Sequence, residues 1–173
     1  MPPEQQPDLD PSPIFAALER HGVRYIVIGA VAAIAQGYPL NTGDLDVTPA
    51  RDPGNLERLA AALVELEARI RVPNDPAGVE FPIDGDYLSR ADSWTLRTPY
   101  GDLDVLFVPA GTRGYDDLRR QAVSFDIEGT PTPMAALIDL IRMKEAAGRP
   151  KDLAQLPALK QTLEVARERE SQS

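Results

Sequence analysis

The chain has 173 residues, 43% of them hydrophobic and 26% charged, a balance typical of one globular domain with a hydrophobic core. It contains no cysteine, which excludes disulfides and thiolate metal sites. The net charge is −9, and the whole excess lies in residues 1–110, because residues 111–173 hold equal numbers of basic and acidic side chains. This balance disfavours a general affinity for nucleic acid.

The first segment, residues 1–13, is rich in proline and is expected to be disordered. It lacks the basic and apolar stretches of a secretory signal, and no segment approaches the ~20 apolar residues of a membrane span, so we expect a cytoplasmic protein without a membrane partner. A short helix is predicted over residues 14–19, with Ser12 as its N-cap and Pro13 at its first position.

An apolar, β-rich run at residues 23–30 predicts a buried strand. The alanine-rich segment that follows predicts a short helix ending at Gly37, and a loop should connect it to a short strand over residues 44–50. Residues 51–70 then have the apolar periodicity of an amphipathic helix.

The second half of the chain alternates between strands and helices. Residues 72–78 are predicted as a loop, and residues 93–98 and 102–108 as a hairpin that turns at Gly101. A further strand pair is expected over residues 123–132.

The remaining residues predict helices. One helix should open at Thr132-Pro133 and reach Gly148, and two more should cover residues 149–156 and 157–170, separated at Pro157. We therefore divide the chain into the N-terminal segment, a core over residues 14–132 and a helical part over residues 133–173.

The pentapeptide GDLDV occurs twice, at residues 43–47 and 101–105. In a strand, side chains two residues apart share a face, with Cα atoms about 6.6 Å apart. Asp44 and Asp46 should therefore point the same way, as should Asp102 and Asp104. If the two strands are neighbours in one sheet, three or four carboxylates converge.

Convergence of carboxylates needs a counterion, because two such charges ~5 Å apart repel by roughly 3 kcal/mol at an effective dielectric constant of ~20. Mg²⁺ prefers carboxylate oxygen, and three aspartates can hold two ions that clamp a phosphoryl displacement. The alternative is a pair of ordinary turn-to-strand junctions with solvated aspartates.

Gly29 stands between the predicted strand at residues 23–30 and the helix that follows. The unpaired amides of such a helix start suit a phosphate, and a glycine lets the backbone approach a ligand closely. No lysine or second glycine accompanies Gly29, so a simple tight turn is the alternative.

Taken in order, the strand, glycine turn, helix, T-x-D-x-D element and later acidic strand resemble the nucleotidyltransferase superfamily. That superfamily includes DNA polymerase beta, the antibiotic nucleotidyltransferases and the AbiEii-type and mycobacterial nucleotidyltransferase toxins. Gly29, Asp44, Asp46 and Asp104 match its pattern, and the resemblance spans roughly residues 22–156. It implies an α+β fold, in which helices pack a mixed sheet and a helical part follows.

The segment LIRMKEAAGRPKDLAQL is similar to an element of the toxin-like members, the closest group in this resemblance. The match implies that Lys144 reaches a triphosphate and that Asp152 supports the site. From the residues alone, Lys144 continues the apolar stripe of Met134, Leu137 and Ile141, where a lysine can also extend to the surface.

The resemblance implies transfer of a nucleoside monophosphate from an NTP to an acceptor hydroxyl, with two Mg²⁺ ions. Asp44, Asp46 and Asp104 would hold the metal ions and act in catalysis with Lys144. The nucleotide would contact Gly29, Ala30, Thr42, Lys144 and Asp152.

The toxin-like match implies a tRNA 3′ end as acceptor and a cognate antitoxin as partner. An acidic N-terminal part equally suits a small cationic antibiotic such as an aminoglycoside. Three departures from the family pattern, Ala30, Asn41 and Gln155, also leave open a degenerate member that binds a nucleotide or a partner without chemistry.

Overall fold

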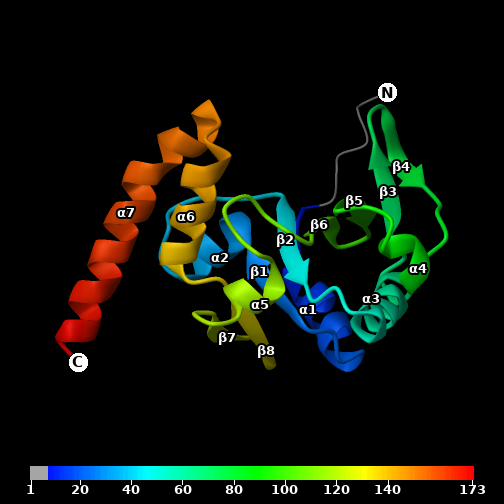
Figure 1. The fold of residues 1–173 in the computed structure, drawn as a ribbon, viewed down its shortest axis with the longest axis horizontal. Coiled ribbons are helices and arrows are strands. Elements are labelled where there is room, and N and C mark those ends of the chain that lie inside the picture. Colours follow the sequence, from blue (N-terminus) through cyan, green and yellow to red (C-terminus); the bar gives the residue numbers. More distant parts are fainter. Residues whose placement is uncertain (1–7) are drawn as a thin grey trace.

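A computed structural model describes residues 8–173, within which eight strands form one mixed sheet in the order β4-β3-β5-β6-β2-β1-β8-β7 (Figure 1). The helices are α1 (Pro11–Arg20), α2 (Gly29–Ala35), α3 (Pro53–Glu65), α4 (Gly85–Leu88), α5 (Tyr115–Leu118), α6 (Leu137–Ala147) and α7 (Pro150–Ser171). The strands are β1 (Tyr25–Ile28), β2 (Asp44–Pro49), β3 (Arg69–Val72), β4 (Asp75–Val79), β5 (Ser93–Thr98), β6 (Gly101–Leu106), β7 (Val123–Ile127) and β8 (Thr130–Met134). The predicted α+β class is confirmed.

The middle of the sheet is built from β1, β2 and β6. β2 runs antiparallel to β1 and parallel to β6, so the two GDLDV copies lie side by side with the same direction. The aliphatic residues of both copies are fully buried, namely Leu45, Val47, Leu103 and Val105. This alternation confirms that one face of each strand packs into the core while the aspartates occupy the other.

The N-terminal helix begins earlier than predicted. α1 starts at Pro11, with Asp10 rather than Ser12 at its N-cap. The backbone amide of Asp10 donates to the carbonyl of Tyr100 at 2.8 Å, and Leu9 packs on the core. The expectation of disorder over residues 1–13 is therefore wrong from residue 9 onward, and residues 1–7 lie outside the described part of the chain.

The predicted helix over residues 51–70 was too long. α3 ends at Glu65, and Glu67 adopts a φ of 53°, in the left-handed region that turns the chain. Ile70, expected on the apolar stripe of the helix, lies in β3 instead, and the predicted loop at residues 72–78 contains the start of β4. Pairing of β3 with β5 and β4 overrides the helical pattern of the sequence.

The helix predicted from Thr132 begins only at Leu137. Thr132 and Pro133 belong to β8, and Met134 of that strand pairs with Val27 of β1. The helical C-terminal part therefore starts after β8 rather than at residue 133.

The predicted break at Pro157 is absent, because α7 continues through it. Pro157 is exposed, and Leu153, whose carbonyl loses its helical donor there, is 50% exposed. Water can therefore hydrate that carbonyl, which makes the proline tolerable. The prediction of two separate helical segments was wrong.

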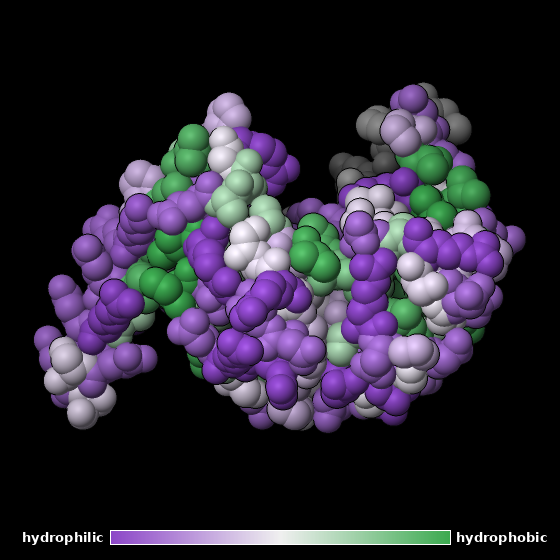
Figure 2. Space-filling model, viewed as in Figure 1, coloured by the Kyte–Doolittle hydropathy of each residue, from purple (hydrophilic) through white to green (hydrophobic). Residues whose placement is uncertain are grey.

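Two projections flank the middle of the sheet. α6 and α7 form one, and the β3–β4 hairpin forms the other, with the ends of β2 and β6 between them (Figure 1). On the face shown in Figure 2, these projections border a wide notch. None of the helices in the described part of the chain is both long and apolar enough to cross a membrane.

Candidate active site

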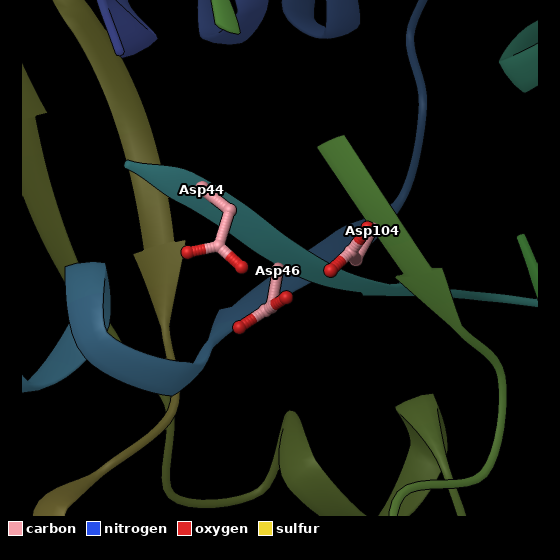
Figure 3. Close-up of side chains that lie close together, drawn as sticks. All are labelled: Asp44, Asp46 and Asp104. Carbon is pink, nitrogen blue, oxygen red and sulfur yellow. The ribbon is translucent and has the colours of Figure 1, made fainter. Parts of the chain in front are cut away.

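Three carboxylates converge where β2 and β6 lie side by side. Asp46 pairs in register with Asp104, and Asp44 lies two residues before Asp46 on the same face. One oxygen of each carboxylate lies within 4.8 Å of those of the other two. Figure 3 shows all three side chains directed toward a common space. The convergence predicted from the repeated pentapeptide is therefore present.

Gly29 lies against this cluster. It is the first residue of α2 and has a φ of +70°, a conformation that favours glycine. A Cβ atom at this position would lie 2.3 Å from Oδ2 of Asp46. The glycine turn therefore lets the start of α2 approach the carboxylate, and no side chain caps the amides of that first turn.

Electrostatics in the cluster are unfavourable without a cation. Burial, reinforced by the carboxylates of Asp104 and Asp44, raises the pKa of Asp46 to about 7. Burial also raises the pKa of Asp104, and the guanidinium of Arg71 opposes that rise. Burial and mutual repulsion thus disfavour the charged forms of Asp46 and Asp104, which makes the site suited to a positive ion.

A cleft of about 610 Å³ opens at the carboxylates. The three aspartates line it on the sheet, and Lys144, Arg149 and Lys151 line it from α6, α7 and the residue between them. Gly29 and Ala30 lie in its wall beside Asp46. The cleft thus combines an acidic cluster with a basic wall, an arrangement suited to a metal-bound polyphosphate.

Lys144 is held in place by an ion pair with Asp152. Nζ of Lys144 lies 3.2 Å from Oδ1 of Asp152, and Nε of Arg149 lies 2.6 Å from Oδ2. These hydrogen bonds hold the pKa of Asp152 at about 2, well below its ordinary value, although its side chain is fully buried. Asp152 therefore remains ionised and joins the end of α6 to the start of α7.

The other predicted site residues lie at different distances from the cluster. Thr42 Oγ1 donates to Oδ1 of Asp44 at 3.0 Å, so Thr42 orients a carboxylate from the cleft wall. Gln155 also lines the cleft. Asn41 is exposed just before Thr42 and is not among the residues that line the cleft.

Two arginines that the sequence analysis did not single out contact the second GDLDV copy. Arg71 lies 3.1 Å from Asp102 and 3.0 Å from Asp104, and Arg97 lies 3.4 Å from Asp102. The misassigned helix placed Arg71 outside the sheet. The alternation of Arg69, Ile70 and Arg71 was the available signal, since period two is typical of a strand.

The cluster fits divalent metal ions on two observations of this structure. All of its candidate donors are carboxylate oxygens, the ligands that Mg²⁺ prefers. The space beside Asp46 is kept clear by a glycine whose Cβ would fill it. Asp44, Asp46 and Asp104 are the residues that could hold such ions.

Comparisons with known proteins agree on the fold. No family model matches the sequence, and no curated protein matches it by sequence. Among solved structures, a lincomycin-bound lincosamide antibiotic adenylyltransferase, LnuA, is similar with a TM-score of 0.58 and 12% identity, over 88% of this chain and 98% of that one.

Two further structures are similar at comparable levels. The enzyme ANT(2″)-Ia, in complex with adenylyl-2″-tobramycin, has a TM-score of 0.56 and 16% identity, over 94% of this chain and 96% of its own. A putative nucleotidyltransferase from Thermotoga maritima has a TM-score of 0.54 and 15% identity, over 83% of this chain and 86% of its own. The sheet, the paired aspartate strands and the C-terminal helices of this chain therefore form a nucleotidyltransferase fold.

Proposed function

We propose that this protein is a Mg²⁺-dependent nucleotidyltransferase, which transfers a nucleoside monophosphate from an NTP to an acceptor hydroxyl. The observation that carries the proposal is the meeting of three carboxylates beside Gly29, in a cleft that Lys144, Arg149 and Lys151 also line. The similar solved structures support it, because two of them are antibiotic-modifying nucleotidyltransferases.

Each group in the cleft has a distinct role in this proposal. Asp44 and Asp46 would hold a metal ion, and Asp104 would complete the site for a second one. Bound ions neutralise the triphosphate and stabilise charge on the transferring phosphate. Lys144, oriented by Asp152, and the first amides of α2 at Gly29 and Ala30 bind the phosphate oxygens.

The direction of transfer follows from the order of the strands. α2 and Gly29 follow β1, whereas Asp104 lies on β6, two strands away across β2. With the phosphates at Gly29, an in-line attack brings the acceptor hydroxyl from the side of β6. Asp104 is then the carboxylate nearest to that hydroxyl and accepts its proton.

A small-molecule hydroxyl is the acceptor that we favour. The net charge of −9 disfavours a polyanion. Arg142, which could have extended a basic surface toward RNA, is paired with Asp117 and Asp139, at 3.0 Å each, and does not line the cleft. The lincomycin and tobramycin named for the similar structures belong to this chemical class.

A tRNA 3′ end, with a cognate antitoxin as partner, is the second candidate acceptor. Fewer observations support it than support a small-molecule acceptor: Arg149 and Lys151 line the cleft and could contact a phosphate backbone. Salt separates the two classes, since transfer to RNA should weaken steeply as ionic strength rises.

The test is to incubate the purified protein with each labelled NTP, Mg²⁺, and either total tRNA or a panel of lincosamides and aminoglycosides. The matched control is the double variant Asp44→Asn/Asp46→Asn. Label that moves to an acceptor only with the wild type supports transfer and names both substrates. Mg²⁺-dependent nucleotide binding without transfer to any acceptor would instead indicate a degenerate member, to which Ala30, Asn41 and Gln155 would contribute.

A further inference from the structure

Arg71 bridges the two carboxylates of the second GDLDV copy. Its Nη1 lies 3.1 Å from Oδ2 of Asp102, and its Nη2 lies 3.0 Å from Oδ1 of Asp104. The three side chains are 25%, 5% and 16% exposed, respectively. This is a largely desolvated contact of one guanidinium with two anions, unlike a mobile surface pair.

The sheet register explains how Arg71 reaches the site. Ile70 pairs with Leu96, which places Arg71 in the row of Thr95, and Thr95 pairs with Asp104. Arg71 and Asp104 are therefore two strand spacings apart, about 10 Å. A long arginine crosses that distance over the short side chain of Thr95, so the contact is built into the pairing of β3, β5 and β6.

The three candidate metal ligands consequently differ in charge compensation. Among the residues that the structure describes, Asp44 and Asp46 form no ion pair, whereas Asp104 pairs with Arg71. A divalent ion at Asp44 and Asp46 meets carboxylates that no described basic side chain contacts directly, although the charge of Lys144 acts on Asp46 from further away. An ion at Asp104 meets a permanent cation already on one of its oxygens, and the two repel each other.

We propose that Arg71 neutralises Asp104 in place of a second divalent ion. The nucleotide-free protein therefore binds one ion, at Asp44 and Asp46. Asp104 accepts an ion only together with the nucleotide, whose negative charge compensates the added one. Arg71 is thus a positioning residue that orders metal loading. This inference rests on the proposed function, because it assigns the order in which the same site fills.

The experiment measures Mn²⁺ binding to the nucleotide-free protein, by the loss of the free-ion signal in electron paramagnetic resonance. We expect the wild type to bind one Mn²⁺. Arg71→Gln should bind a second ion. Its affinity for that second ion should be about tenfold or more higher than the affinity of the wild type for a second ion. Arg69→Gln is the matched control, because Arg69 lies two residues away in β3 and pairs with Glu80 rather than with the cluster; it should bind as the wild type does.

A second variant separates charge from packing. Arg71→Lys keeps one cation beside the carboxylates and should still bind one Mn²⁺, whereas loss of packing alone would affect Lys and Gln alike. If Arg71→Gln does not fold, Arg71→Gln/Asp102→Asn removes the cation and one of its anions together and should bind two ions.

Two results would overturn the inference: wild-type stoichiometry and affinity in a folded Arg71→Gln protein, or two ions in the nucleotide-free wild type. Failure of the proposed function has a different signature. In that case the wild type binds no Mn²⁺, or binds it no better than Asp46→Asn, and no label is transferred.

Discussion

The two GDLDV copies have the same residues, the same direction and the same alternation of buried and polar side chains, yet their carboxylates have different surroundings. In the first copy, Asp46 faces Gly29 and the cleft and has no ion pair with any side chain of residues 8–173. In the second, Asp102 is buried and held by Arg71 and Arg97. The neighbouring strands, rather than the pentapeptide, therefore determine which carboxylates are paired with arginines.

This difference follows from the position of each strand in the sheet. β2 is flanked by β1, which ends at the glycine turn of α2, and this turn lies against Asp46 where that residue lines the cleft. β6 is flanked by β5 and, beyond it, β3, which bring arginines over the same face. One side of the site thus presents its carboxylates to the cleft, and on the other side two arginines pair with the carboxylates.

The largest expected effect is the difference in nucleotidyl transfer between proteins in which one aspartate of either copy is replaced by asparagine. Asp46→Asn should lower nucleotidyl transfer by about 1000-fold or more, because it removes a metal-binding carboxylate. Asp102→Asn should keep transfer within about tenfold of the wild type but lose about 2 kcal/mol of unfolding free energy, because two arginines lose their buried anion. Single-turnover transfer and urea denaturation measure the two effects. An equal loss of transfer in a folded Asp102→Asn protein would mean that both copies serve the chemistry.

The second prediction concerns a substitution that fills the space beside Asp46 in the first copy. Gly29→Ala should lower Mg²⁺-dependent transfer about 100-fold, because its Cβ would lie 2.3 Å from Oδ2 of Asp46. Gly22→Ala is the matched control: its φ is +66°, close to the +70° of Gly29, but its nearest neighbour would be Arg58 Cδ at 3.7 Å. Both variants should lose about 1 kcal/mol of stability from the left-handed backbone, and only Gly29→Ala should lose transfer. Equal activity of the two variants would contradict a close ligand at Gly29.

The third prediction concerns how far the buried carboxylate of Asp46 lowers the free energy of unfolding of the metal-free protein. The pKa of Asp46 is about 7 in the folded, metal-free protein, against an ordinary value of 3.8. Between these values the folded state binds more protons than the unfolded state, so the free energy of unfolding falls as pH rises from about 4 to 7. Relative to Asp46→Asn, the wild type should lose about 3 kcal/mol over that range, since one pKa unit corresponds to about 1.4 kcal/mol.

Urea denaturation in EDTA at pH 5 and pH 7.5 measures this loss. Saturating Mg²⁺ at pH 7.5 should restore the stability of the wild type and leave Asp46→Asn unchanged. A wild-type protein whose stability relative to the variant is the same at both pH values would show that neither burial nor the neighbouring carboxylates raise the pKa of Asp46.

Local pattern made the acidic cluster predictable. The alternation of aspartate with leucine and valine predicted a strand and predicted that its aspartates share one face. The repeat suggested that two such strands lie together. The assignment of Asp44, Asp46 and Asp104 as metal ligands, and of Lys144 as a phosphate ligand, stays a prediction, although their positions around one cleft agree with it.

The parts that the sequence did not predict depend on contacts between distant segments. Ile70 continues the helical periodicity of α3, and its pairing with Leu96 of β5 and Val79 of β4 places it in a strand instead. The role of Arg71 was hidden by the same error. Pro157 predicted a helix break by a local rule. In the folded chain that face of α7 is exposed, so water can replace the helical hydrogen bond that the proline removes, and the sequence alone does not show this exposure.

The smallest expected effect lies at the residue that precedes each pentapeptide. Thr42 precedes the first copy and donates to Oδ1 of Asp44 at 3.0 Å, whereas Tyr100 precedes the second copy. Thr42→Val keeps the shape of the side chain and removes that donor, so Mg²⁺ affinity should fall by about three- to tenfold, as expected for one hydrogen bond to a carboxylate. Tyr100→Phe, the matched change beside the second copy, should leave the affinity unchanged. Titration of each variant with Mn²⁺ decides the point: equal affinities would mean that Asp44 is oriented by the strand alone, and a loss in Tyr100→Phe would mean that the second copy contributes to the first ion after all.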